Sequence, residues 1–561
     1  MKTRIITILS AAILAICAAS SCTDYLETTS TTKVSDILTW SDEQYTDLYV
    51  NGFYSYIAEY GQFGTLQFNS NMTEGLTNTL KYGSPTPGAH YGDANNYLFY
   101  PERITNQGSL LDVWSATYTR IRRVNEFLVS LPKYSKYSEE TNLRYEAQAR
   151  FFRAFLYLQL AKRHCYGADG GVILYSDVNF VKDKAHATED ETWDFIAADL
   201  DFAAKNLPAQ WNSENSGRIT KYMAYALKTR AMLYAGRWEE VVEAADSVIL
   251  HGGYSLTGNY ADSWVGDNSE SIIQFKFNLP QKLSHVHEIY HVPYGDFTRV
   301  GEAEIGGTAT PTQEFVEMFE DKNGNAIDWS AWHTGEPVAT RPPYENLEPR
   351  FQATVLYNGC DWKGGKMECT PDGNYGRYMK YRADGYPNGR TVTGYYLKKF
   401  LQCTTDDDFK NTIIANGKRG SATWVEMRLA EVLLNRAEAL YHTEGDALAD
   451  VNTVRARVGL PAKTGVSGDA LFNLIRKERT LELSYEGHLW WDMRRWKLAA
   501  TEYNNYRCHG MKPDGTEGNY TFQYVEVDDE DRKFPEKLYV LPIPTSETNN
   551  NSLIKQYSLW L

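Results

Sequence analysis

Cysteine is scarce in this sequence, with 7 residues in 561. No C-x-x-C pair occurs, and structural zinc sites depend on such spacing, so nothing in the cysteine pattern indicates a zinc-binding module. After Cys22 an odd number of cysteines remains, which leaves at least one thiol unpaired in an oxidising compartment. Cys360 and Cys369 are near enough in sequence to form a disulfide, and inert structural thiols are the alternative. The remaining cysteines are Cys165, Cys360, Cys369, Cys403 and Cys508.

Long blocks of basic residues are also missing. Lys and Arg number 57 against 72 Asp and Glu, and the formal net charge is -15. A chain that follows a nucleic-acid backbone needs clustered cations to neutralise phosphates, so we expect no nucleic-acid partner. The sequence contains neither a G-x-S-x-G nucleophile motif nor a P-loop. It therefore gives no support for catalysis and none for a bound cofactor.

Long apolar runs are confined to the N-terminus. Lys2 and Arg4 precede an apolar run over 5–19, which is of signal-peptide length and too short to span a bilayer comfortably. We expect residues 1–21 to be a signal peptide. The small residues before Cys22 resemble the lipobox of bacterial lipoproteins, in which that cysteine is acylated, with Ala19 where Leu is commonest. Ordinary secretion, with Cys22 a free or disulfide-bonded thiol, is the alternative.

Aromatic residues are abundant, with 14 Trp, 40 Tyr and 22 Phe. Many of them stand at helical spacing, which predicts amphipathic helices rather than ligand contacts. The body begins near residue 41, and its first predicted helical face consists of Tyr45, Leu48, Tyr49, Gly52 and Tyr56. Further helices are predicted over 114–128, 149–166, 193–207 and 219–256.

Two stretches predict helical hairpins. In residues 219–256 only Gly236 and Arg237 separate two apolar patterns, and alanines on the facing stripes allow close antiparallel packing. In residues 422–461 the turn is Glu444-Gly445-Asp446. Both resemble tetratricopeptide hairpins. Between them, residues 258–421 are rich in Gly, Pro, Asn and Asp, which predicts a loop-rich region with short β-like runs such as 271–277.

Six pieces of the sequence, in order, resemble the SusD/RagB family of outer-membrane nutrient-binding lipoproteins. They are the N-terminal segment ending at Cys22 with Asp24 and Glu27 behind it, ARFFRAFLYLQLAKRHCYG (149–167), LYAGRWEEVVEAADSVI (233–249), EVLLNRAEALYHTEGDALADVNTVRARVGLP (431–461), LFNLIRKERTLELSYEGHLWWDMRRWKLAA (471–500) and LYVLPIPTSE (538–547).

The resemblance implies a fold dominated by α-helices. About four tetratricopeptide-like hairpins would form the body, with a loop-rich subdomain carrying short β segments. The corresponding layout is a signal peptide (1–21), an acylated cysteine with its tether (22–40), an N-terminal helical region (41–257), a loop-rich insert with a ligand platform (258–421) and a C-terminal helical region (422–561).

The resemblance also implies a function. Members of the family capture oligosaccharides at the cell surface and pass them to a TonB-dependent transporter of the SusC type, without catalysis. We therefore expect a lipid-anchored protein of the outer membrane, with a glycan and this transporter as partners. A RagB-like branch captures peptides, which is the alternative cargo.

The strongest family signature, over 478–492, has a structural interpretation. Arg479 with Glu482, and Asp492 with Arg495, stand at i, i+3 spacing, where opposite charges support a helix. Its neighbouring tryptophans are predicted to pack the body rather than bind sugar. These are Trp490, Trp491 and Trp496.

Sugar recognition needs flat apolar faces together with planar donors and acceptors on rigid loops. In the family such residues come from the loop after the first helices and from the insert. Here that loop is 68–100, and in the insert two tyrosines flank Pro293, while two tryptophans stand three apart outside any apolar stripe and are expected to be exposed. The candidate ligand-binding residues are Asn71, Tyr82, Tyr290, Tyr294, Trp329 and Trp332.

Two metal-site patterns compete with this interpretation. His287-Glu288-Ile289-Tyr290-His291 satisfies the H-E-x-x-H zinc-hydrolase pattern, yet Pro293 and the flanking residues do not predict the long helix that this chemistry needs. Residues 321–328 carry oxygen ligands at calcium-like spacing, but Gly324 is misplaced, so a solvated turn is favoured. The acidic runs 406–408 and 528–531 are likewise interpreted as solvated loops.

Overall fold

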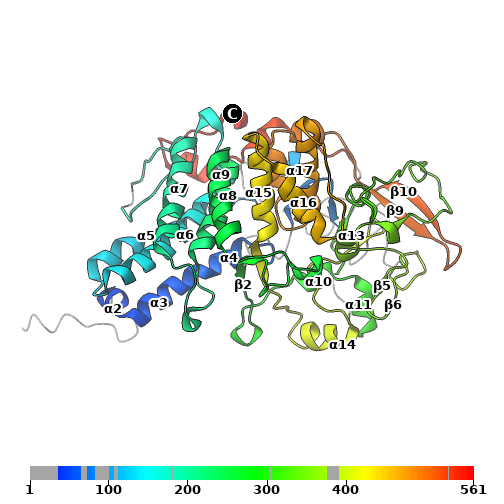
Figure 1. Ribbon diagram of the computed structural model, residues 1–561, viewed down its shortest axis with the longest axis horizontal. Coiled ribbons are helices and arrows are strands. Elements are labelled where there is room, and N and C mark those ends of the chain that lie inside the picture. Colours follow the sequence, from blue (N-terminus) through cyan, green and yellow to red (C-terminus); the bar gives the residue numbers. More distant parts are fainter. Residues whose placement is uncertain are drawn as a thin grey trace, which may run out of the picture.

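The computed structural model describes residues 36–64, 72–82, 100–105, 111–179, 181–302, 306–375, 391–528 and 530–561. Long helices gather on one side of the molecule, and short helices and strands occupy the other (Figure 1). Of the helices in these ranges, none combines the length and the apolar character that crossing a membrane requires.

The N-terminal helices stack in sequence order. They are α2 (Asp36–Ser41), α3 (Glu43–Asn51), α4 (Ser55–Tyr60), α5 (Trp114–Tyr134), α6 (Glu139–His164), α7 (Glu189–Asn206), α8 (Lys221–Ala235) and α9 (Trp238–His251). From α5 to α9 each helix packs against the next. The tight connection between α8 and α9 depends on Gly236, which ends α8 in the left-handed conformation at φ 71°.

The C-terminal helices continue this stack. They are α15 (Leu429–His442), α16 (Ala447–Arg457), α17 (Gly468–Glu482), α18 (Leu489–Arg495), α19 (Ala499–Glu502) and α20 (Thr545–Asn550). Because α15 packs against α8 and α9 as well as α16 and α17, the two predicted hairpins lie side by side although the insert separates them in sequence.

The insert carries short elements. Its helices are α10 (His287–His291), α11 (Tyr294–Arg299), α12 (Gln313–Glu317), α13 (Pro349–Thr354) and α14 (Asp406–Asp408). The antiparallel pairs are β1 (Leu80–Tyr82) with β3 (Ala309–Pro311), β2 (Ser271–Phe275) with β8 (Trp424–Arg428), β4 (Val355–Leu356) with β7 (Tyr396–Leu397), β5 (Asp361–Trp362) with β6 (Gly365–Lys366), and β9 (His509–Asp514) with β10 (Thr521–Glu526). The helix-dominated fold class with short β segments is thus confirmed.

The first predicted helical face is partly wrong. Leu48 is 61% exposed, whereas Val50, Phe53 and Ile57 are buried. Within α3 the buried side chains are Thr46 and Val50, so Leu48 lies off the inward face. After Asn51 the helix breaks, and a 3-10 turn over Gly52–Tyr54 separates α3 from α4. A 3-10 turn advances the chain by three residues per turn, so the inward face shifts along the sequence.

Ion pairs in the signature also differ from the prediction. Asp492 does pair with Arg495, at 2.7 Å, but Arg479 pairs with Asp492, at 2.6 Å, rather than with Glu482. The signature is therefore built from contacts between helices as well as within them. Trp490 and Trp491 are buried, as predicted, and Trp496 is half-buried.

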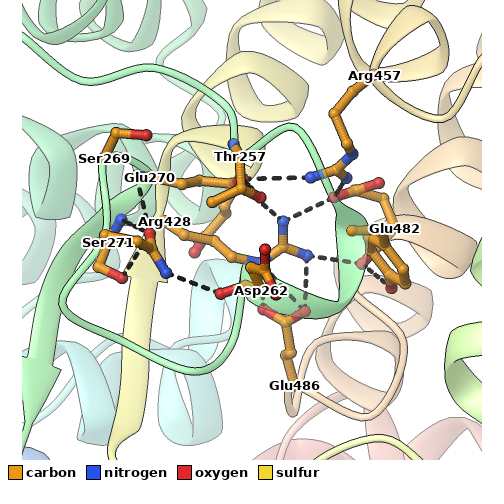
Figure 2. Close-up of polar contacts among 12 residues, drawn as sticks. Thr257, Asp262, Ser269, Glu270, Ser271, Arg428, Arg457, Glu482 and Glu486 are labelled. Carbon is orange, nitrogen blue, oxygen red and sulfur yellow. Dashed lines mark hydrogen bonds and ion pairs between the residues drawn. The ribbon is translucent and has the colours of Figure 1, made fainter.

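Glu482 belongs instead to a buried ionic network that joins the insert to the C-terminal helices (Figure 2). At its centre Arg428 lies 2.7 Å from Glu270, 2.6 Å from Glu482 and 2.7 Å from Glu486. Arg457 reaches both Glu270 and Glu482. Although burial opposes ionisation, Arg457 and Arg428 hold the pKa of Glu482 well below its usual range.

The acidic run 528–531 is not simply a solvated loop. Asp528 is fully buried, and its carboxylate lies 2.8 Å from Lys81 and 2.8 Å from Arg532. Glu530 and Asp531 are exposed, as expected. Local composition could not reveal Asp528 as buried, because one of its partners stands more than 400 residues away in sequence.

The five described cysteines are all free thiols, so Cys360 and Cys369 do not form a disulfide. Burial raises the pKa of Cys360 to about 11. The reactive thiolate is then scarce at neutral pH, which agrees with an inert structural role.

Candidate functional site

The structure brings two of the predicted site regions together. Strand β1 pairs with β3 so that Tyr82 lies opposite Ala309. Just before β3, the N–H of Gly307 donates to the carbonyl of Val292 at 2.7 Å, and that of Thr308 donates to Tyr290 at 2.9 Å. Residues 80–82, 287–292 and 306–311 therefore form one contiguous unit, which we call the β1–β3–α10 edge.

Tyr82 stabilises this edge and does not expose its ring to a ligand. Its side chain is 1% exposed, and its hydroxyl accepts the N–H of Met72 at 2.5 Å. This hydrogen bond links the two ends of the segment 72–82. Tyr82 offers no free face for a sugar in this arrangement, while Asn71 and residues 83–99 lie outside the described residues.

Buried charges hold the base of the edge in place. Lys81 pairs with Asp528, and the guanidinium of Arg532 donates to the carbonyl of Gly75 at 2.9 Å as well as to Thr77. Although burial favours the neutral acid, Arg532 and Lys81 lower the pKa of Asp528 well below its usual range. An ionised, ion-paired cluster of this kind rigidifies the segment 72–82 that it contacts.

Tyr290 is the predicted residue best placed for contact with a ligand. It lies on α10 and is half-buried, and its carbonyl accepts hydrogen bonds from the N–H and hydroxyl of Thr308. Its backbone is therefore fixed while part of its side chain faces solvent. Tyr294 begins α11 after Pro293, and its side chain lies outside what the structure describes.

A series of aromatic contacts connects half-buried Phe277 with α10, and the sequence analysis did not predict these contacts. Phe277 is half-buried and contacts His285, with 4.8 Å between ring centroids. His285 contacts Phe63 at 4.6 Å, and Phe63 contacts His287 of α10 at 4.5 Å. The alternation of Phe275, the last residue of β2, with Phe277 was the available signal, since residues two apart share a face of an extended strand.

Trp329 and Trp332 are buried, so the expectation that they are exposed is wrong. They are 5% and 7% exposed, and the indole N–H of Trp332 donates to the carbonyl of Thr340 at 2.8 Å. The reason is that their loop folds onto β10, where Val338 pairs with Phe522. More broadly, every aromatic side chain whose burial the structure describes is buried or half-buried.

The H-E-x-x-H segment does not assemble the geometry of a zinc hydrolase. Helix α10 is five residues long, and the carboxylate of Glu288 accepts the N–H groups of Gln402 at 3.0 Å and Cys403 at 3.2 Å. Burial raises the pKa of Glu288 to about 7. Within the described ranges, no group of three or more His, Cys, Asp or Glu side chains is placed to hold a metal ion.

The calcium-like loop is a turn. The carboxylate of Asp321 accepts the N–H of Asn323 and that of Asn325, both at 2.8 Å, and the side-chain amide of Asn325 as well. These bonds use the carboxylate oxygens within the turn itself, as short polar turns commonly do. The preference for a turn over a calcium site is consistent with this geometry.

Comparison with known proteins identifies the family. The family model described as "SusD family" matches residues 269–560, and one described as "Starch-binding associating with outer membrane" matches residues 24–233. The chain belongs to the SusD family. Two SusD-like proteins of Formosa agariphila are 23% and 22% identical over 509 and 492 residues, which cover 86% and 85% of this chain and 89% and 87% of theirs.

Solved structures of SusD-like proteins share the fold. One from Bacteroides fragilis is 28% identical, with a TM-score of 0.76, and the match covers 93% of this chain and 98% of that one. A SusD-like carbohydrate-binding protein from the same species is 22% identical, with a TM-score of 0.72 and coverage of 92% and 100%. A laminarin-binding SusD-like protein is 20% identical, with a TM-score of 0.61 and coverage of 92% and 100%. At these last two identities the similarity attests the fold alone.

Proposed function

We propose that this SusD-family protein captures oligosaccharides at the outer surface of the outer membrane and delivers them, without cleaving them, to a TonB-dependent transporter of the SusC type. The observation that carries the proposal is family membership along nearly the whole chain, together with the carbohydrate-binding and laminarin-binding descriptions of its structural neighbours. Acylation of Cys22 would supply the anchor, with residues 22–40 as the tether.

The site we propose is the β1–β3–α10 edge. It offers the half-buried ring of Tyr290 on fixed backbone, and the half-buried ring of Phe277 adjoins it through His285 and Phe63. Half-buried rings can receive the C–H face of a sugar without a large loss of side-chain entropy.

Affinity electrophoresis against a panel of neutral and acidic polysaccharides tests the function. We expect at least one polysaccharide to retard the protein and to remain uncleaved after prolonged incubation. Absence of retardation by every polysaccharide would contradict glycan capture, and appearance of shorter products would contradict the non-catalytic role.

Substitution of the two rings tests the site. Tyr290→Ala and Phe277→Ala should each weaken glycan binding about tenfold, the equivalent of about 1.4 kcal/mol, because each removes one stacking face. Tyr222→Ala is the matched control, since Tyr222 is a half-buried tyrosine of α8, away from the edge. Wild-type affinity in both ring variants, with unchanged thermal stability, would place the site elsewhere.

Association with the transporter requires its own experiment. Purification of tagged protein from native outer membranes should recover a SusC-type transporter, and Cys22→Ala should release the protein from the membrane. Recovery of the transporter with bound peptides instead of glycans would favour the alternative cargo.

A further inference from the structure

A pocket lies on the helical side of the molecule, away from the β1–β3–α10 edge. The first half of α5, the segment 173–179 and Glu547 of α20 enclose a volume of about 330 Å³. In Figure 1, α5 lies beside α6 at one end of the molecule, and α10 lies beyond α15. None of the candidate site residues lines this pocket.

The floor of the pocket is apolar and its sides are aromatic. Trp114, Ile121 and Ile173 are at most 2% exposed and form the floor. Tyr118 and Tyr175 are half-buried and form the sides. Flat rings around an apolar floor match the C–H face of a sugar ring.

The walls are fixed before any ligand arrives. The hydroxyl of Tyr118 accepts the N–H of Ile173 at 2.9 Å and donates to its carbonyl at 3.0 Å. The side-chain amide of Asn125, on the buried face of α5, donates to the carbonyls of Tyr175 at 2.8 Å and Asp177 at 3.2 Å. A pocket whose walls are already ordered loses little entropy on binding.

The rim supplies hydrogen-bonding groups. Ser115 and Thr119 present hydroxyls from the exposed side of α5, and Asn179 is exposed on the facing segment. Asp177 and Glu547 add carboxylates. Hydroxyls, an amide and carboxylates can donate to or accept from the hydroxyl groups of a sugar.

The charge around the rim favours a neutral ligand. Arg122 lies 3.3 Å from Glu126, and the ammonium of Lys184 lies 4.6 Å from the centre of the Tyr175 ring. Among the described residues that line the pocket, Arg122 is the one cation, and Asp177 and Glu547 supply two carboxylates. Since the carboxylates are in excess, an anionic sugar such as a uronate would meet repulsion.

We propose that this pocket is a second carbohydrate site, which binds a neutral sugar unit of the captured glycan. The proposal rests on the proposed function, because the ligand class is the same. The volume is near the lower end for ligand sites and suits about one or two sugar rings. Two separate sites on one chain would raise the apparent affinity for a long glycan above that for a short one.

The experiment compares variants in which the pocket is filled from its rim or loses a wall. Thr119→Trp places an indole into the pocket from an exposed helix position, and Tyr175→Ala removes a wall while leaving the backbone bonds of that segment available. Val129→Trp is the matched control, because Val129 is also an exposed position of α5 but does not line the pocket. Isothermal titration calorimetry with the full chain would use neutral hexasaccharides of glucose, xylose and mannose, with hexagalacturonate as the anionic comparison.

We expect the wild type and Val129→Trp to bind a neutral hexasaccharide at two sites. In Thr119→Trp the number of sites should fall to one, and in Tyr175→Ala the affinity of one site should fall at least tenfold, with unchanged melting temperature in Thr119→Trp. Two sites of wild-type affinity in both variants would overturn the second site and leave the proposed function standing. Tighter binding of hexagalacturonate at the pocket would overturn the neutral ligand. Failure of the wild type to bind any saccharide would overturn the proposed function together with this inference.

Discussion

Glu74 shows how one buried carboxyl can couple stability to pH. It is 1% exposed, and one carboxylate oxygen accepts the N–H of Gly487 at 2.8 Å while the other lies 3.5 Å from the side-chain amide of Gln62. Burial raises its pKa from 4.5 to about 7, against the hydrogen bonds that favour its ionised form. The folded state therefore holds a proton on Glu74 over a range in which the unfolded chain has released it.

We predict that Glu74→Gln makes the protein less sensitive to pH between about 4.5 and 7. In this window the native state binds more protons than the unfolded state, so the free energy of unfolding falls as pH rises, by up to about 1.4 kcal/mol per pH unit for one proton. The amide cannot ionise, so this component of the slope should vanish. Urea denaturation at several pH values measures it.

Glu288 provides the internal comparison, because burial also raises its pKa to about 7 and it remains in the variant. Part of the slope should therefore persist in Glu74→Gln. An undiminished slope would mean that Glu74 is ionised in the folded protein at pH 6.

At the scale of elements, the tight turn between α8 and α9 isolates a backbone effect. Gly236 adopts φ 71°, and a Cβ placed there would meet only Trp238, at 3.8 Å. A substitution would therefore strain the backbone without a steric clash. The left-handed conformation costs a residue with a Cβ about 1 kcal/mol or somewhat more.

We predict that Gly236→Ala lowers the free energy of unfolding by about 1 kcal/mol, and that Gly236→Asn lowers it less, because Asn tolerates this conformation better. Gly258→Ala is the control, since a Cβ at Gly258 meets no atom within 4 Å and its φ lies outside the left-handed region. Equal losses at the two glycines, measured by chemical denaturation, would argue against backbone strain as the cause.

An element could be predicted from the sequence where the residues that determine it stand close together in the chain. The α8–α9 and α15–α16 hairpins were predictable because apolar spacing and turn residues act over a few positions. The shift of the inward face after α3 was not, because the 3-10 turn at Gly52–Tyr54 leaves no mark in the spacing. The exposure of Trp329 and Trp332 was also mispredicted, since β10, onto which their loop folds, lies nearly 200 residues further along the chain.

The candidate site, too, was predictable only in so far as nearby residues in the sequence determine it. Composition located Tyr290 in a loop-rich region, but only tertiary structure could show that it lies on the same edge as Tyr82 and that the Tyr82 ring is buried. Phe277 was overlooked because half-burial of a ring depends on its neighbours, here His285 and Phe63. Residue type indicated which kind of ligand contact to expect, but only the three-dimensional arrangement showed which of these residues can make it.

At the scale of the whole molecule, the ionic network around Arg428 connects the insert to the C-terminal helices. Glu270 stands just before β2 at the start of the insert, while Glu482 ends α17 and Glu486 follows it. Arg428 itself ends β8, which pairs with β2. One guanidinium thus links both regions, and all three of its carboxylate partners are buried or nearly so.

We predict that Arg428→Met destabilises the protein by about 3–5 kcal/mol, because its buried carboxylates lose a partner that replaces their hydration. Hydrogen exchange should accelerate on both sides of the network, at residues 270–275 and at 482–487. Arg122→Met is the control, since Arg122 and Glu126 are exposed and such pairs contribute about 0–1 kcal/mol. Faster exchange on one side only would show that Arg428 supports that region without linking the two.

The same variant should also change the response to acid. Burial opposes ionisation of Glu482, but Arg457 and Arg428 together hold its pKa well below the value in the unfolded chain. A carboxyl with a lowered pKa stabilises the fold above its unfolded pKa, and this contribution is lost only as the pH falls through the lower folded value. Without Arg428 the folded pKa of Glu482 rises, so acid unfolding of Arg428→Met should begin at a higher pH than in the wild type. Circular dichroism during an acid titration measures that onset, and coincident curves for the two proteins would mean that Arg457 and Arg350 keep Glu482 ionised without Arg428.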